Sequence, residues 1–325
     1  MMKLFYLILL IFANSSYAHT ADSLFFDTTF LSNYSVINKI LQEEENFKEV
    51  WFYSTDGIKL NGLFGYNPNA PYTIIFCAGF YPGRKEGLAS FIKMVPPECN
   101  ILFFDARGHG NSYGSFFSSI YRYGKNEYKD ILGAIQFVYA QAPNPIFIHA
   151  ICAGTYHAIQ ALSDEQISAY PIKGFICDSG LLSLVNSCHV PRIHFCQKII
   201  PRFLLSWYKN DSKQEIKERY LCKILCGISH SFFTIATYIV KPFLKNNEET
   251  INLHETIKKI SCPIFFIHSY DDTYAPIESI QKISECISQK TCWWLEKSEH
   301  ALHHIKHREL YIQKLLDFIY QARCV

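Results

Sequence analysis

Residues 145–155 read Pro-Ile-Phe-Ile-His-Ala-Ile-Cys-Ala-Gly-Thr, a short apolar run that passes at once into small residues around a cysteine. A run of this length suits a strand buried on both faces, and a helical pattern follows it. A strand that turns directly into a helix strains the residue at the turn, so its neighbours two positions away must be small. Ala150 and Gly154 satisfy this requirement. The stretch therefore predicts that Cys152 is an exposed, activated nucleophile at the start of a helix, and an ordinary buried cysteine is the alternative.

Similar apolar runs lie on both sides of this stretch and alternate with helical patterns. The runs cover residues 72–77, 101–105, 172–177, 263–268 and 291–295, and the helical patterns cover 86–94, 126–142, 155–162, 277–288 and 303–322. Such alternation predicts an α/β fold with a mostly parallel central sheet, flanked by helices and wound in right-handed crossovers. Residues 47–66 instead alternate apolar and polar positions around Asp56-Gly57, which predicts an antiparallel hairpin at the sheet edge.

The alternation breaks between residues 181 and 257, which we interpret as an inserted helical cap. One of its apolar helical stretches, 224–240, carries no Asp, Glu, Lys or Arg. Its serines, threonines and histidine favour a helix that covers the core over a membrane span. The core is then predicted in two parts, 47–180 and 258–325, with 19–46 as an N-terminal segment.

The first 18 residues have the pattern of a cleavable signal peptide. Lys3 precedes an apolar run too short to span a bilayer comfortably, and the small-residue site Ser16-Tyr17-Ala18 follows it. We expect cleavage after Ala18 and a secreted or periplasmic protein, and an uncleaved N-terminal anchor is the alternative.

The composition describes a folded chain with little net charge. Apolar residues make up 49% of the sequence and charged residues 18%, which excludes disorder for most of it. Lys and Arg total 31 against 29 for Asp and Glu. This balance provides no general field that would attract nucleic acid, so we expect no nucleic-acid partner.

Several segments of the chain resemble the α/β-hydrolase superfamily, whose nucleophile elbow reads G-x-S-x-G. Residues 105–112 resemble its D-x-R-G-H-G-x-S segment, and residues 76–80 lie where that family places its oxyanion loop. Residues 268–276 are similar to the H-G-x-x-D-x-x-V-P segment that carries the acid, and Ser298-Glu299-His300 occupies the position of the base. The motifs look like those of serine aminopeptidase and lysophospholipase members. The resemblance covers most of the chain from about residue 50.

The resemblance implies a triad of Cys152, His300 and Asp272 in the chain order of that fold. The Cys152 sulfur would attack an acyl carbonyl, His300 would take and return protons, and Asp272 would fix the imidazole tautomer. Backbone N–H groups of Phe80 and Ala153 would hold the developing oxyanion. No metal or cofactor is expected to take part.

The sequence departs from the family pattern at three positions. Cysteine replaces serine at 152, as in dienelactone-hydrolase-like members and some acyltransferases, and Ala150 and Ala78 replace the first elbow glycine and the loop histidine. Alanine still permits a tight turn. A cysteine nucleophile favours thioesters or activated esters over amides.

Two other carboxylates compete with Asp272 for the role of the acid. Asp271 is its neighbour, but Asp272 fits the family spacing to Pro276. Asp178 follows the sixth predicted strand, where some members of the superfamily carry the acid. We interpret Asp105, Arg107 and His109 as structural.

The predicted function is an exported α/β-hydrolase of the carboxylesterase kind, which cleaves an ester or thioester through an acyl-enzyme. An acyltransferase on the same fold and a non-catalytic binding protein are the alternatives. The apolar cap implies a small-molecule substrate with a hydrophobic acyl or aromatic part, and the cap is also the part that would touch a membrane surface.

Cysteine and histidine clusters offer two further readings. Cys188, Cys196, Cys222 and Cys226 fall in one segment and are the best disulfide candidates, although a zinc site is the alternative. His300, His303, His304 and His307 fall at helical spacing, which we interpret as a solvated face rather than a metal site.

Overall fold

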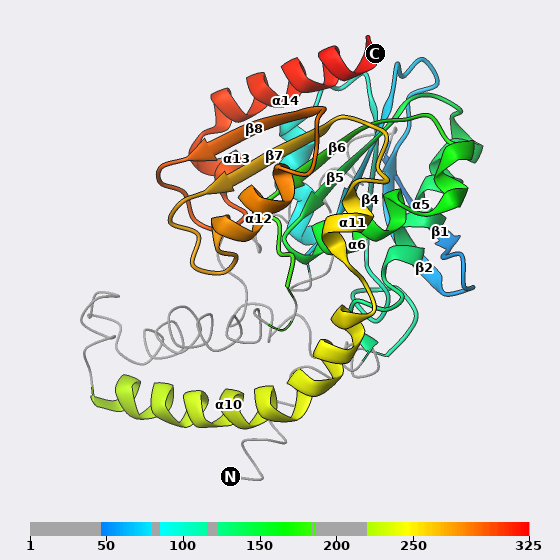
Figure 1. Cartoon of the computed structure of the whole chain (residues 1–325). Helices are drawn as coiled ribbons and strands as arrows, with labels where there is room; N and C mark the ends of the chain where they lie inside the picture. Colours follow the sequence, from blue (N-terminus) through cyan, green and yellow to red (C-terminus); the bar gives the residue numbers. More distant parts are fainter. Residues whose placement is uncertain (1–46, 80–84, 116–121, 184, 186–219, 325) are drawn as a thin grey trace.

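The computed structural model describes residues 47–79, 85–115, 122–183, 185 and 220–324 (Figure 1). The predicted signal peptide 1–18, the N-terminal segment 19–46 and most of the first half of the predicted cap lie outside these residues. The boundaries of the cap therefore stay a prediction.

A single sheet of eight strands forms the centre of the described fold, in the order β1-β2-β4-β3-β5-β6-β7-β8. The strands are β1 (Phe47–Tyr53), β2 (Lys59–Gly65), β3 (Thr73–Cys77), β4 (Asn100–Phe104), β5 (Ile146–Ile151), β6 (Ile172–Asp178), β7 (Ile264–Ser269) and β8 (Lys290–Leu295). β2 pairs antiparallel with both β1 and β4, and every other neighbouring pair is parallel. The predicted α/β class and the edge hairpin are thereby confirmed.

Helices cover both faces of the sheet, as Figure 1 shows. They are η2 (Lys85–Met94, a 3-10 helix), α5 (Tyr128–Gln141), α6 (Ala153–Leu162), η3 (Glu165–Ala169), α10 (Tyr220–Glu249), α11 (Leu253–Ile257), α12 (Ile277–Ser284), α13 (His303–Lys306) and α14 (Arg308–Arg323). Side chains alternate across the strands and thus supply two cores. Ile75 and Ile148 pack with α5, α6 and α12, whereas Ile74 and Phe147 pack with η2 and α14.

The parallel strands bring their carboxyl ends to one edge of the sheet. At that edge β3 runs into Ala78-Gly79, β5 into Cys152, and β7 into the loop that holds Asp272. Open α/β sheets place ligands outside this edge, so the topology gathers the predicted site residues in one region.

Helix α10 extends beyond this edge, away from the sheet, and contains Pro242 (Figure 1). Its portion Tyr220–Ile239 is the one stretch among the described residues long and apolar enough to cross a membrane. Length and composition alone do not separate a membrane span from a surface helix.

Candidate active site

Cys152 lies at a sharp turn between β5 and α6. Its φ of 55° and ψ of −126° fall in the left-handed half of backbone space, which a residue with a side chain adopts only under strain. The Cys152 N–H donates to the Asp178 carbonyl at 3.0 Å, and the Cys152 carbonyl accepts from the Leu181 N–H at 3.0 Å. The residues at the end of β6 therefore hold the strained turn, and the cysteine remains partly exposed.

Two glycines permit the turn because backbone passes very close to it. A Cβ on Gly154 would lie 2.6 Å from the Cys77 carbonyl oxygen and 2.7 Å from that of Ala78. A Cβ on Gly79 would lie 2.8 Å from the Cβ of Cys152. The first helical turn of α6 thus packs directly against the loop after β3, where only glycine fits.

His300 and Asp272 come from two different loops and meet above the sheet edge. His300 Nδ1 donates to Asp272 Oδ2 at 2.7 Å. Asp272 Oδ1 accepts from the backbone N–H groups of Tyr274 at 2.8 Å and Ala275 at 3.0 Å. Burial alone would raise the pKa of Asp272, but the hydrogen bond from His300 and these partners lower it below its usual value. Asp272 therefore remains a carboxylate that orients the imidazole.

The His300 ring also interacts with the side chain of Cys152. Burial alone would lower the pKa of His300, but the negative charge of Cys152 and the hydrogen bond to Asp272 raise it to about 10. His300 Nε2 itself has no hydrogen-bond partner of standard geometry among the described residues. The ring is thus within electrostatic range of the cysteine, with one nitrogen left for a proton transfer. The Tyr274 ring stacks on it at a centroid distance of 5.1 Å.

The rival carboxylates have other partners. Asp271 Oδ1 accepts from the Ser269 hydroxyl at 2.6 Å and from the Ser298 N–H at 2.9 Å. Asp178 Oδ2 accepts from the Tyr311 hydroxyl at 2.6 Å. Of the three acids considered from the sequence, Asp272 alone forms a hydrogen bond with the His300 side chain among the interactions of the described residues.

A buried polar chain, which the sequence analysis missed, fastens the loop of His300. Ser179 Oγ donates to Asp178 Oδ1 at 3.0 Å, lies 2.8 Å from His303 Nε2 and accepts from the Ala301 N–H at 2.9 Å. His303 Nδ1 in turn lies 2.7 Å from Ser298 Oγ. The chain ties the residues on both sides of His300 to the end of β6. A serine that follows a buried strand carries no sequence pattern that would have identified it.

Cys152, Ser179 and Ala301 are the non-glycine residues with positive φ in the described part of the chain. All three belong to this one region, since Ala301 follows His300 and bonds to Ser179. Backbone strain tends to gather where a fold positions functional groups. The strained positions therefore point to the same site as the side chains do.

The segment interpreted as structural forms a buried ion network. Asp105 accepts from Lys85 Nζ at 2.9 Å, and Arg107 donates to Asp130 and to Asp56 at 2.7 Å each. These bonds join the end of β4 to η2, to α5 and to the hairpin turn.

Of the two predicted oxyanion donors, one is described. Ala153 is buried and begins α6 directly after Cys152. Phe80 lies outside the described residues. The role of both N–H groups stays a prediction.

Apolar side chains surround Cys152 on the side of the predicted cap. Tyr123, Tyr156, Leu181, Leu244 and Ala275 form a buried cluster against which Cys152 packs. Leu181 and Leu244 come from the predicted cap. The immediate surroundings of the cysteine are thus apolar.

The interpretation of His300, His303, His304 and His307 as a solvated helix face is wrong. His303 and His304 are both buried, His303 in the polar chain and His304 against Ser90 and the Phe91 ring. Among the described residues no group of histidines, cysteines and carboxylates has the arrangement of a metal site. Cys222 and Cys226 lie on α10, and the other two disulfide candidates, Cys188 and Cys196, lie outside the described residues.

Comparison with known proteins shows the fold but no close relative. No protein-family model matches the chain. An uncharacterised protein, YqkD of Bacillus subtilis, is 25% identical over 267 residues, which cover 82% of this chain and 77% of YqkD. At this identity the resemblance names no activity.

Solved structures of similar shape are esterases and α/β hydrolases. The esterase Pf2001 of Pyrococcus furiosus superposes with a TM-score of 0.61 at 20% identity, covering 87% of this chain and 93% of that structure. The α/β hydrolase GrgF of Penicillium sp. gives 0.59 at 14% identity, covering 86% and 99%. The esterase EaEST of Exiguobacterium antarcticum gives 0.57 at 15% identity, covering 84% and 100%. At such identities the likeness establishes the fold alone.

Proposed function

Because the chain has the α/β-hydrolase fold, we propose that it hydrolyses carboxylic esters or thioesters with Cys152 as nucleophile, His300 as acid and base, and Asp272 as the partner of His300. One observation carries the proposal. The His300 ring donates through Nδ1 to Asp272 Oδ2 at 2.7 Å and also interacts with the side chain of Cys152, which lies at the strained turn after β5. The esterases among the similar structures support the same reaction class.

Acylation begins from a charged pair. In the proposed reactive state His300 carries a proton, and its positive charge stabilises the thiolate form of Cys152, which attacks. The sulfur adds to the acyl carbonyl carbon, and the carbonyl electron pair moves to oxygen, where the N–H groups of Ala153 and Phe80 would hold it. When the intermediate collapses, His300 Nε2 gives its proton to the departing alcohol or thiol, which leaves a thioester on Cys152.

Deacylation uses the same histidine as a base. The now neutral Nε2 accepts a proton from water while the water oxygen adds to the thioester carbonyl. Collapse of the second intermediate expels the Cys152 thiolate and releases the carboxylic acid. Asp272 holds Nδ1 protonated throughout, so that Nε2 is the nitrogen that exchanges protons.

The substrate class follows from the surroundings of Cys152. Tyr123, Tyr156 and Leu244 bring apolar surface next to the nucleophile. Apolar side chains favour a hydrophobic acyl or aromatic group, because its transfer from water to such surface is favourable. We therefore include in the proposal a small-molecule ester or thioester with such a group.

Export is a further part of the proposal. Its support is the signal-peptide pattern that ends at Ala18. Expression of the full chain in a bacterial host with a cleavable-signal pathway, followed by fractionation and N-terminal sequencing, tests it. Mature protein that begins at residue 19 outside the cytoplasm is expected, and full-length protein confined to the cytoplasm contradicts export.

Replacing Cys152 tests the proposed chemistry. Cys152→Ala should lower hydrolysis of a short aryl ester to the rate of buffer while thermal unfolding stays close to that of the parent. Iodoacetamide should inactivate the parent and modify Cys152, as peptide mapping by mass spectrometry would reveal. Cys324→Ser is the matched control, since Cys324 is exposed at the far end of α14, and it should keep full activity.

Cys152→Ser separates the alternatives. If the oxyanion site suits a serine hydrolase, the serine variant retains or gains activity on simple esters; if the site suits the larger sulfur, most activity is lost. An acyltransferase would show turnover only when an alcohol, amine or thiol acceptor is added. A binding protein would turn over no member of a wide ester and thioester panel, and that result would overturn the proposal.

A further inference from the structure

Helix α10 carries a stripe of exposed apolar side chains along its outer face. The stripe, as used below, consists of Tyr220, Ile224, Ile228, Ile235, Tyr238 and Ile239. Successive members are mostly three, four or seven residues apart, so they share one face of the helix. Tyr220, Ile235 and Tyr238 are 80%, 63% and 84% exposed, values unusual for apolar side chains in one row.

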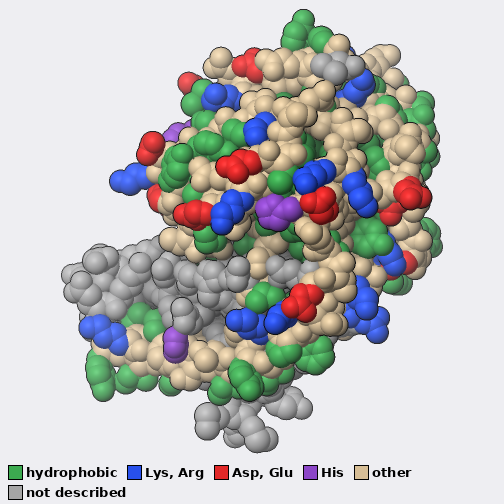
Figure 2. All heavy atoms as spheres, viewed as in Figure 1, with side chains coloured by type: hydrophobic (Ala, Val, Ile, Leu, Met, Phe, Trp, Pro, Cys, Tyr) green, Lys and Arg blue, Asp and Glu red, His purple; other side chains and the backbone are tan. Residues whose placement is uncertain are grey.

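The opposite face of α10 is the one that packs against the protein. Cys222 and Leu244 are buried, and Asn247 Nδ2 donates to the Tyr123 carbonyl at 3.1 Å. These contacts come from both ends of the helix. Figure 2 accordingly shows hydrophobic side chains gathered along the outer edge of α10. The stripe is therefore directed away from the body of the protein.

The lysines of α10 lie along one side of this stripe. Lys223, Lys241 and Lys245 are exposed and, at 3.6 residues per turn, fall on one flank of it. No Asp or Glu occurs between Tyr220 and Asn247, and Glu249 at the end of the helix pairs with Lys245 at 3.5 Å, which leaves Lys223 and Lys241 as the charges that argue most for an anionic surface. A row of lysines beside an apolar face complements a surface that is apolar inside and negative at its rim, as an anionic lipid bilayer is. Tyrosine, with an apolar ring and a polar hydroxyl, suits the boundary between the acyl chains and the headgroups of a bilayer.

We propose that α10 docks on anionic lipid bilayers, lying flat at the interface with the stripe among the acyl chains and its lysines at the headgroups. A flat orientation is favoured over a span because one face of α10 is buried at Cys222, Leu244 and Asn247 while the opposite face carries the stripe, and a span would place both faces in lipid. Docking also has a consequence for the site, since Leu244 belongs to the apolar cluster around Cys152. A docked molecule would present that cluster close to the lipid, whatever reaction Cys152 performs.

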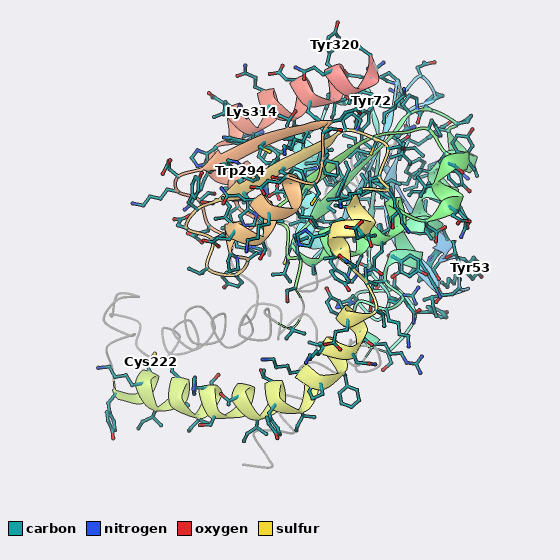
Figure 3. All side chains as sticks on the ribbon, viewed as in Figure 1. Tyr53, Tyr72, Cys222, Trp294, Lys314 and Tyr320 are labelled. Atoms are coloured by element: carbon teal, nitrogen blue, oxygen red, sulfur yellow. The ribbon has the colours of Figure 1, made fainter. Side chains whose placement is uncertain are left out.

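Vesicle flotation of the mature protein tests the proposal. Vesicles of phosphatidylcholine mixed with phosphatidylglycerol should bind the protein. Vesicles of phosphatidylcholine alone should bind it several-fold less, because their headgroups carry no net negative charge that would attract the lysines. Ile224→Ser, Ile228→Ser and Ile235→Ser combined should weaken binding about tenfold or more. The matched control combines Ile305→Ser, Leu310→Ser and Tyr320→Ser. These three side chains are also exposed, but Ile305 lies on α13 and Leu310 and Tyr320 lie on α14. Tyr320 projects at the opposite end of the molecule from α10 (Figure 3). This control should bind as the parent does.

Three results would overturn the proposal. The first is binding unchanged in the stripe variant or lost equally in the control. The second is resistance of the bound parent to alkaline carbonate extraction, which would indicate a span. The third is a dimer in sedimentation that the stripe variant abolishes, together with lipid binding absent in the parent, which would assign the stripe to a second copy. Hydrolysis of a short soluble ester in the absence of lipid serves as a folding control, because the stripe contains no proposed catalytic residue.

A gain-of-signal variant covers the case in which the stripe variant fails to fold. Tyr238→Trp keeps an amphipathic ring at the most exposed stripe position. Lipids brominated on their acyl chains should quench the fluorescence that this variant adds to the parent spectrum. Added fluorescence that these lipids leave unquenched while the protein is vesicle-bound would contradict docking through the stripe.

Discussion

Two neighbours, Cys152 and Asp272, raise the pKa of His300 against the effect of its burial. Burial favours the neutral ring, whereas the Cys152 charge and the Asp272 carboxylate favour the imidazolium and raise its pKa to about 10. Removing the cysteine charge leaves burial opposed by Asp272 alone, so we expect Cys152→Ala to lower the titration midpoint of His300 by at least one pH unit. Proton–carbon NMR of histidine-labelled protein, recorded as a function of pH, measures this midpoint.

Assignment and control use two further variants. His300→Gln identifies the resonance among the 13 histidines of the chain. Cys324→Ser, far from the site, should leave the midpoint unchanged. A midpoint that stays near pH 10 in Cys152→Ala would mean that the cysteine does not carry the charge assigned to it.

Ser179 has no proposed catalytic role, but its hydrogen bonds position the loop that carries His300. Its hydroxyl is the meeting point of Asp178, His303 and the Ala301 N–H. Asp178 stays ionised there, because His149, His303 and Tyr311 together outweigh burial and hold its pKa below the usual value. The loop of His300 is thus held in part by a buried carboxylate, through the Ser179 hydroxyl.

At the scale of elements, the packing of α6 against the loop after β3 depends on Gly154. A methyl group there would lie 2.6 Å from one carbonyl oxygen and 2.7 Å from another, and both belong to backbone that cannot move aside cheaply. We expect Gly154→Ala to lower the free energy of unfolding by about 1–3 kcal/mol and to lower activity as the turn shifts. Urea unfolding and ester hydrolysis measure the two effects.

Gly227→Ala is the matched control for this substitution. Gly227 also lies within a helix, α10, but a Cβ there would meet nothing within 4 Å. Alanine should stabilise α10 by up to about 1 kcal/mol, since it is the better helix former. Equal effects of the two substitutions would show that close approach is not what Gly154 provides.

Elements whose residues carry a local pattern were predictable, and those set by tertiary contacts were not. The apolar runs gave all the parallel strands within one or two residues, and Asp56-Gly57 gave the hairpin. The predicted helix 303–322 is instead split at His307, because His303 and His304 must turn inward to Ser179 and Ser90. Helical spacing alone could not reveal which side of those histidines is buried.

In the candidate site, too, residues marked by a local sequence pattern were predictable and residues placed by tertiary contacts were not. Cys152 was identifiable because its turn constrains its neighbours in sequence. The pairing of His300 with Asp272, separated by 28 residues, was anticipated through family resemblance and spacing. Ser179, His303 and Tyr274 were missed, since the contacts that bring them to the site join segments far apart in the chain.

For the whole molecule, buried neutral histidines make stability sensitive to acid. Burial lowers the pKa of His157 to about 3 and that of His304 to about 4. In the unfolded chain both titrate near 6.5, so the unfolded state binds more protons between pH 6.5 and 4. The stabilisation is complete above pH 6.5 and is lost as pH falls through the folded values. We expect each histidine to contribute a decrease in unfolding free energy of up to about 1.4 kcal/mol per pH unit as pH falls through that window.

His157→Phe isolates one of these contributions. His157 makes edge contacts with the Tyr123 and Tyr156 rings, which a phenylalanine can keep. Urea unfolding at pH 7.5, 6 and 5 should reveal a slope about one proton smaller than that of the parent. His254→Phe, at an exposed position, should keep the parent slope. A slope that is the same in His157→Phe and the parent would contradict the assignment; the parent slope alone does not test it, because the raised pKa values of the buried Glu127 and Asp130 change stability in the opposite sense over this range.

The three strained positions at Cys152, Ser179 and Ala301 have a consequence for how this protein ages in the test tube. Each left-handed conformation costs about 1–3 kcal/mol and lasts only while the surrounding fold enforces it. Partial loosening of the sheet edge would therefore let these turns relax before any strand or helix is lost. We therefore expect a stored preparation to lose the arrangement of Cys152 and His300, and with it any ester hydrolysis, before its circular dichroism spectrum or its solubility changes.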